Sequence, residues 1–160
     1  MRLVGLTFVA ALLSGTANAA ADVTFTNSET YVDATFEWPK SAKNKLQVQD
    51  AIRKMFSDLA GKYLAPGQTL KVNITQVDLA GRIEPAISLA HDIRIMRSVT
   101  WPRLRFSYQV SENGALLSSG EANLADLNYL NGFNRFGSDR LRYERQMVAD
   151  WFRKTLAREA

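Results

Sequence analysis

The sequence has no cysteine, and its 160 residues include a single histidine, His91. Without cysteine the chain has neither a disulfide bond nor a thiol nucleophile. A zinc site needs three or four Cys, His or carboxylate ligands at close spacing, so we predict no metal and no cofactor. A Ser-His-Asp set would have to use His91, which precedes Asp92 in a stretch without periodicity. We therefore predict no catalytic residues, and the composition argues against an enzyme.

A large charge imbalance is also lacking. The formal net charge is +4, and removal of the N-terminal leader, which contains Arg2, lowers it by one. Residues 92–160 hold eleven basic and eight acidic residues, and ten of the basic ones are arginine. Arginines alternating with aromatics are typical of single-strand nucleic-acid grooves, but so small an excess disfavours nucleic acid as a partner. An anionic ligand, if there is one, is expected to bind to this second half.

The first nineteen residues, MRLVGLTFVAALLSGTANA, have the layout of a secretory signal peptide. A basic residue precedes a short apolar run, and Ala17-Asn18-Ala19 forms a cleavage site. The run is too short to span a bilayer, so we expect no transmembrane segment in the mature chain. We predict cleavage after Ala19, a single α+β domain over residues 20–160, and a periplasmic location, since exported proteins without cysteine are ordinary there. The alternative is that residues 1–19 form a buried N-terminal helix.

Hydrophobic periodicity predicts two strands with a helix between them in the first half of the chain. Residues 22–27 alternate apolar residues with threonine, as a strand does. Over residues 48–63, apolar residues recur at three- and four-residue spacing, which indicates an amphipathic helix. Asn44 and Gln47 have the spacing of a capping box at its start. Residues 70–79 form the second strand, and a slip in the apolar phase at Val77 and Leu79 predicts a bulge or a bend.

The second half predicts a hairpin. Residues 103–110, RLRFSYQV, alternate strictly between apolar and polar. Asn113-Gly114 is the strongest short hairpin signal, and residues 115–124 return as the partner strand. Strands joined by so tight a turn are antiparallel. The polar side chains of the first of these strands should then face water or a ligand.

A final helix, capped by Ser138 or Asp139, completes the prediction. One face of it carries apolar residues, and Arg145, Arg153 and Lys154 are expected outside. Two helices and several strands, each with one apolar face, pack most simply as two layers. The predicted fold is therefore α+β, a mainly antiparallel sheet of about four to five strands with both amphipathic helices on one face.

The stretch 123–152 runs from the end of the hairpin into the last helix, and residues 126–137 within it form a loop rich in asparagine, glycine and aromatics, with arginines in and after it. Such a loop on a rigid sheet could bind a peptide, a glycan or an anionic group. The candidate ligand-binding residues are Asn128, Tyr129, Asn131, Asn134, Arg135, Arg140 and Arg142. A secondary basic patch could be formed by Arg94, Arg97, Arg103 and Arg105.

The same residues also have a purely structural reading. Asparagines satisfy turn backbone, and Tyr129, Leu130, Phe133 and Phe136 would pin the loop to the core. Arg140 or Arg142 would reach back to Asp126 or Asp139, and Glu144 would pair with Arg140.

Four segments together carry a resemblance to a known family: GQTLKVNITQVDLAG, VTWPRLRFSY, LADLNYL and RLRYERQMVADWFRKTL. They resemble a family of exported proteobacterial proteins catalogued as a domain of unknown function, over about Val23 to Leu156. The resemblance implies export and one compact domain, and no activity, ligand or cofactor.

Three functional hypotheses remain. The first is a non-enzymatic binding or interaction module of the cell envelope, whose partner is a protein, peptide, glycan or anionic ligand. The second is a hydrolase whose carboxylate pair is assembled by folding. The third is a structural accessory subunit of an envelope complex, which predicts an exposed apolar patch.

Overall fold

The computed structural model describes residues 19–37, 41–84 and 93–156. The predicted leader up to residue 18 and the pair His91-Asp92 lie outside the described residues. The order of elements is β1 (Ala20–Phe25), a 3₁₀ turn (Ser28–Thr30), α1 (Ala42–Tyr63), β2 (Gln68–Asp78), β3 (Arg82–Ile83), β4 (Arg94–Ile95), β5 (Arg103–Glu112), β6 (Ala115–Ala125) and α2 (Arg142–Trp151), followed by a π-helical turn (Phe152–Leu156).

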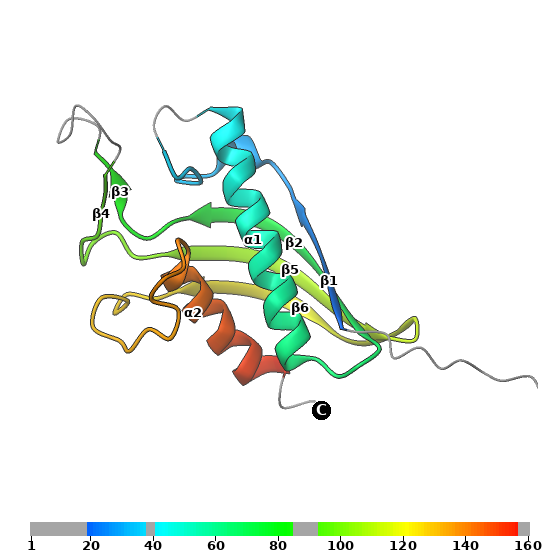
Figure 1. Ribbon diagram of the computed structural model, residues 1–160. Helices are drawn as coiled ribbons and strands as arrows, with labels where there is room; N and C mark the ends of the chain where they lie inside the picture. The colour runs from blue at the N-terminus through cyan, green and yellow to red at the C-terminus, as the bar shows by residue number, and fades with distance from the viewer. Residues whose placement is uncertain (1–18, 38–40, 85–92, 157–160) are drawn as a thin grey trace, which may run out of the picture.

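The main sheet has four strands in the order β1-β2-β5-β6, and β3 pairs with β4 in a separate small sheet. β2 runs antiparallel to β5, and β5 to β6, but β1 and β2 are parallel. The parallel pair arises because α1 connects β1 to β2 and returns the chain to its starting end. Both helices lie on the same face of the main sheet (Figure 1). The predicted α+β class, with a mainly antiparallel sheet covered on one face, is confirmed.

The helix α1 begins at a different cap from the predicted one. Ser41 is the N-cap residue, and its hydroxyl accepts a hydrogen bond from the backbone N–H of Asn44. The predicted capping box of Asn44 and Gln47 is therefore wrong, because Asn44 already lies in the first turn. The predicted apolar face is confirmed, since Val48 and Phe56 are fully buried.

Backbone irregularities occur where the sequence predicts them. The pairing of β2 with β5 shifts between Ile74 and Gln76, which is the predicted bulge. Asn113 and Gly114 have φ values of 50° and 84°. A two-residue type I′ turn requires positive φ at both positions, which explains why Asn-Gly connects β5 to β6.

The helix α2 begins at Arg142, later than the predicted cap at Ser138 or Asp139 implies. The carboxylate of Asp139 accepts a hydrogen bond from the N–H of Leu141 at 2.8 Å, but Leu141 occupies the N-cap position without a side-chain cap of its own. Asp139 therefore orders the turn that precedes the helix rather than capping it.

The core is an aromatic cluster between the two layers. The ring of Phe106 on β5 meets Phe56 of α1 edge to face, with centroids 5.3 Å apart. On its other side Phe106 meets Trp151 of α2, at 4.9 Å. Phe152, in the π-helical turn, packs against Phe56 at 6.2 Å. One residue of the sheet thus ties both helices to the same face.

We expect Phe56→Ala to lower the free energy of unfolding by about 3–5 kcal/mol, because it opens a cavity between α1 and β5. Leu46→Ala is the matched control on the same helix, since Leu46 is 55% exposed. It should change stability by less than about 0.5 kcal/mol. Urea unfolding of the two variants checks this, and equal losses would contradict the assigned packing.

Candidate functional site

The asparagines of the predicted loop hold the loop itself together. Asn131 Nδ2 donates to Asn128 Oδ1 at 2.8 Å. Asn134 Nδ2 donates to the carbonyl of Arg142 at 2.9 Å, and its Oδ1 accepts from the N–H of Phe136 at 2.8 Å. These bonds tie the loop to the start of α2, so part of the hydrogen-bonding capacity of the asparagines is already used.

The aromatic residues of the loop divide into buried and exposed ones. Tyr129 is buried, donates its hydroxyl to the carbonyl of Arg97 at 2.8 Å and meets the ring of Tyr143 edge to face. By contrast, Phe133 is 87% exposed and Leu130 41%. The prediction that these residues pin the loop to the core is wrong for Leu130 and Phe133. It is confirmed for Tyr129, which is buried, and for Phe136, which packs against the core.

The loop arginines contact three separate places. Arg135 lies 3.3 Å from Asp150 on α2. Arg140 stacks 4.1 Å above the ring of Phe36, and its guanidinium lies 3.7 Å from Glu37. Arg142 stacks on the ring of the tyrosine that follows it. The structure therefore brings none of the three together in one described cavity.

The secondary basic patch is likewise dispersed. Arg97 pairs with Glu84. Arg103 lies 4.7 Å above the ring of Trp101. Arg105 is exposed on β5. The fourth member, Arg94, is part of a different and largely buried group.

Folding does assemble a pair of carboxylates, as the hydrolase hypothesis requires. Asp33 and Asp78 are backbone partners in an isolated parallel β-bridge, and each is only 3% exposed. Arg94 lies 2.8 Å from Asp33, and Arg82 lies 3.0 Å from Asp78 and 3.7 Å from Asp33. Burial raises the pKa of Asp78, and Arg82 opposes the shift. Arginines thus neutralise the pair, which favours a structural role.

Glu144 at the start of α2 is a third buried carboxyl. Its Oε1 accepts the N–H of Ala80 at 2.7 Å. Burial raises its pKa, and this hydrogen bond only partly offsets the shift. The adjacent cavity, lined also by Arg94 and Arg140, measures about 10 Å³, which suits a single water. The predicted pairing of Glu144 with Arg140 is therefore wrong: Glu144 joins α2 to the end of β2.

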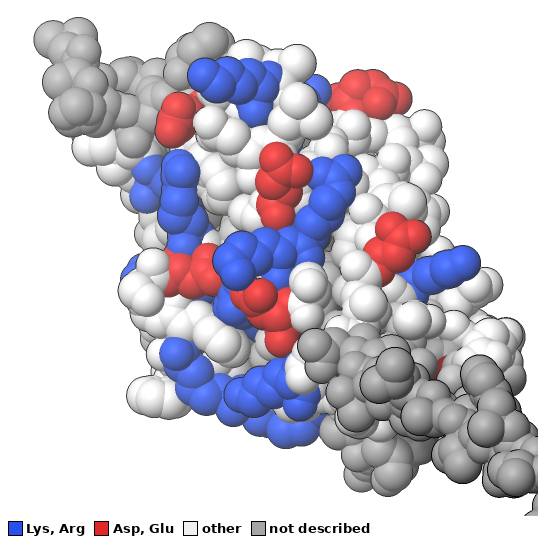
Figure 2. Space-filling model, turned by 45° about the vertical axis from the view of Figure 1, so that its right-hand side comes forward, with Lys and Arg blue, Asp and Glu red and all other residues white. Residues whose placement is uncertain are grey.

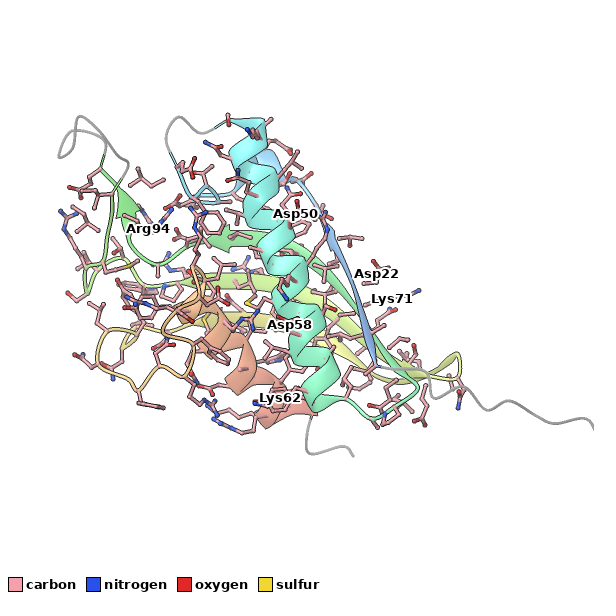
Figure 3. All side chains as sticks on the ribbon, viewed as in Figure 1. Asp22, Asp50, Asp58, Lys62, Lys71 and Arg94 are labelled. Carbon is pink, nitrogen blue, oxygen red and sulfur yellow. The ribbon has the colours of Figure 1, made fainter. Side chains whose placement is uncertain are left out.

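Arg145 joins the two helices instead of facing outward as predicted. Its guanidinium lies 2.8 Å from Asp58 of α1 and 2.8 Å from Asp139, and its side chain is only 15% exposed. Asp58 lies on the side of α1 that is nearest α2 (Figure 3). The hydrogen bond from Arg145 lowers the pKa of Asp58. This ion pair is a contact between α1 and α2, not a ligand site.

A hollow lies on the sheet face that the helices leave open. Its volume is about 500 Å³, and it crosses all four strands. The lining residues whose polar or charged side chains belong to this face are Asp22, Thr24, Lys71, Asn73, Ser107, Gln109, Ser119 and Glu121. The ring of Tyr108 packs instead against Trp151 on the face that the helices cover. Asp22 on β1 and Lys71 on β2 project away from α1 (Figure 3).

Strand alternation explains the polar lining. Paired residues of neighbouring strands share a face, and Asn73, Ser107 and Glu121 form one such row across the sheet. Asn73 Oδ1 accepts hydrogen bonds from the hydroxyls of Thr24 and Thr26, at 3.2 and 2.8 Å. The alternation in residues 103–110 predicts a polar face on that strand. The hollow itself could not be predicted, because it forms only when four strands lie side by side.

Charges of both signs are mixed over the surface. Figure 2 shows lysine and arginine interspersed with aspartate and glutamate on the face in view. In the described residues no group of three or more His, Asp or Glu side chains is placed to hold a metal ion. Over the same ranges, each helix is too short or too polar to cross a membrane.

A protein-family model described as "Protein of unknown function (DUF3016)" matches residues 19–154. No curated protein matches the chain.

Glu144 and Asp58 should give the stability opposite dependences on pH. The pKa of Glu144 is raised above its ordinary value of 4.5, so the unfolded chain releases this proton at a lower pH than the folded protein does. Rising pH therefore lowers the stability contributed by Glu144. Glu144→Gln keeps an oxygen for the Ala80 N–H and does not titrate, so its stability relative to wild type should improve from about pH 4 to 7.

Asp58→Asn is the contrasting variant. The pKa of Asp58 is lowered, so its ionised form stabilises the fold above its ordinary pKa of 3.8 and loses this effect as the pH falls. The variant should therefore lose most against wild type at neutral pH. Urea midpoints across the pH series measure both trends, and parallel curves for all three proteins would refute the assignment.

Proposed function

The chain belongs to the DUF3016 family of proteins of unknown function, and we propose that it is an exported, periplasmic, non-enzymatic binding module of the cell envelope. Its ligand, in this proposal, is a neutral, hydroxyl-rich chain such as a glycan, bound across the open face of the sheet. The leader-like N-terminus and the lack of cysteine support export.

The observation that carries the proposal is the polar hollow on the open sheet face. A hollow of about 500 Å³ falls within the range of small-ligand sites. Its lining residues stand on strands whose opposite face is the aromatic core, so they are held in fixed positions. Preorganised polar groups bind without a large cost in side-chain ordering.

The lining chemistry favours a neutral ligand over an anion. Two carboxylates, Asp22 and Glu121, accompany a single cation, Lys71. The other polar side chains are hydroxyls and amides, which donate and accept hydrogen bonds at close spacing. Sugars present the same two kinds of group, whereas a phosphate or carboxylate would face a net negative surface.

A binding role also agrees with the placement of the perturbed carboxyls. Asp78 and Glu144, whose pKa values burial raises, do not line the hollow. Their partners are protein groups: Arg82 for Asp78 and the Ala80 N–H for Glu144. A hydrolase acting at the hollow would have to use Asp22 and Glu121 as its acid and base, and these stand on the two outermost strands of the sheet.

The accessory-subunit hypothesis has one observation in its favour. Leu127 and Phe133 are 65% and 87% exposed in the loop between β6 and α2. Exposed apolar side chains in one loop are typical of a contact with another protein. We therefore keep docking of this loop to an envelope protein as a second candidate function.

A substitution that fills the hollow tests the proposed binding function. Ser107 stands on β5 in the middle of the hollow, so Ser107→Trp should fill it and reduce oligosaccharide binding by at least about tenfold. The variant Arg135→Ala/Arg142→Ala alters the predicted loop site and should bind as wild type does. Titration of envelope-derived oligosaccharides, followed by NMR on folded samples, gives the affinities. If only the loop variant lost binding, the binding site would be the loop and not the hollow.

Export predicts a defined mature N-terminus. The protein recovered from the periplasmic fraction should begin at Ala20, the first residue of β1. Ala19→Arg should leave the leader attached, since the cleavage site requires small residues. Intact-mass measurement of both forms checks this, and an uncleaved wild-type protein in the cytoplasm would refute the proposed location.

A further inference from the structure

The outer side of β6 has no partner strand among the described residues. β6 ends the order β1-β2-β5-β6, and its pairing with β5 is regular from Ser118 to Ala125. A register shift makes Leu117 a bulge residue, which interrupts the strand before this regular part. The regular part contains neither proline nor lysine, which commonly block pairing at a sheet edge, and its one charged residue is Glu121. This part of β6 can therefore accept one more strand.

The unpaired backbone groups of β6 recur at every second residue. The N–H of Asp126 donates to the carbonyl of Pro102 at 3.3 Å. Because the bonded groups alternate along an antiparallel strand, the even-numbered residues before Asp126 also bond toward β5. The N–H and C=O groups of Glu121, Asn123 and Ala125 therefore point outward. They repeat at roughly 7 Å, which is the two-residue spacing of an extended polypeptide.

A groove lies beside these outward groups. It measures about 380 Å³ and is bounded by the end of β6 and by α2, which lies next to that strand (Figure 1). Asn123 and Ala125 line it from the strand. Leu124, Met147 and Trp151 give it apolar surface, and its remaining lining side chains are polar or charged. Alternate residues of a strand added to β6 would enter this groove.

The helix α2 runs back along β6 in the opposite direction. Its start is tied to the loop that follows β6, since Asn134 Nδ2 donates to the carbonyl of Arg142 at 2.9 Å. At its end the ring of Trp151 meets Tyr108, whose partner on β6 is Gly120. The end of α2 thus lies further back along the strand than its start does.

The groove consequently has opposite charges at its two ends. Asp126 directly follows the last residue of β6. Lys154 comes about one turn after Trp151 and therefore lies at the other end. The third charged residue of the groove, Asp150, is already paired with two arginines of the chain. Within the described ranges neither Asp126 nor Lys154 forms an ion pair, so both charges are available to a ligand.

We propose that this groove binds an extended peptide, a segment of another polypeptide, which adds to β6 as an antiparallel strand. Antiparallel pairing is slightly more stable per residue than parallel pairing. In this direction the N-terminal side of the peptide lies near Asp126 and its C-terminal side near Lys154. The preferred ligand therefore has a basic residue, then apolar side chains that face Met147 and Trp151, and then an acidic residue.

The backbone groups of β6 identify a polypeptide as the occupant. A row of donors and acceptors at the spacing of a strand is matched by another polypeptide backbone, whatever its side chains are. The mixed lining of the groove then selects among sequences. The groove shares no lining residue with the polar hollow, so this proposal goes beyond the proposed binding function and does not depend on it.

Backbone methylation of a probe peptide tests the pairing. The probe is a blocked peptide of about nine residues in which valine alternates with threonine, with lysine near its N-terminus and glutamate near its C-terminus. The outward residues of β6 have their side chains on the open face, and antiparallel partners share a face. The threonines should therefore pair with β6, and the valines should face the groove. N-methylation of the threonines should weaken binding by at least about tenfold, whereas N-methylation of the valines should leave it unchanged.

Position 123 supplies matched variants of the protein. Asn123→Pro removes one outward N–H, which does not bond to β5, and should weaken binding of the unmethylated probe about tenfold. Asn123→Ala keeps that N–H and should bind as wild type does. NMR titration measures the affinities, and circular dichroism should show the same fold for both variants. Asn123 does not line the hollow, so both variants should bind oligosaccharide as wild type does.

Charge reversal tests the direction of the peptide. Lys154→Glu should weaken binding of the probe about threefold, and a probe with lysine in place of its glutamate should recover it. A wild type that does not bind the probe, or equal effects of the two methylation patterns, would overturn the proposal. Sedimentation that showed a dimer dissociated by Asn123→Pro would also overturn it, because a second copy would then occupy the edge. Weaker binding after methylation of the valines alone would exclude the antiparallel direction.

Discussion

The burial of one sheet face beneath two helices is the constraint on which the rest of this structure depends. The chain has no disulfide bond to hold it, so the aromatic contacts of Phe106 with Phe56 and Trp151 must join the layers. Because both helices use the same face, the other face stays open, and its alternate residues are polar. The proposed binding surface is therefore a direct consequence of the way in which the core is built.

The arginine-rich composition of the second half suggested an anionic ligand, but several of these arginines pair with carboxylates of the protein itself. Arg94 and Arg82 neutralise the buried pair of Asp33 and Asp78, and Arg145 joins α1 to α2. These arginines thus form ion pairs in the interior and between the two helices. Carboxylates buried without such partners would cost several kcal/mol each, which explains why the arginines are close to them.

The open sheet face and the open β6 edge are two separate features, and each suggests a different kind of contact. The face offers hydroxyls, amides and a few charges to a polar ligand, while the end of β6 borders a groove lined by both polar and apolar residues.

The sequence by itself determined those features that depend on local spacing: the apolar face of α1, the Asn113-Gly114 hairpin, the bulge in β2 and the alternation of β5. The helix face, the strand alternation and the bulge follow from repeats of about four or two residues, and the turn follows from the positive φ that Asn-Gly tolerates. Only the tertiary structure decided that β1 and β2 are parallel, that Ser41 rather than Asn44 caps α1, and that Glu144 accepts a hydrogen bond from Ala80. It also decided that the hollow crosses four strands, because a hollow and an ion pair depend on which distant segments become neighbours, and no repeat within a segment carries that information.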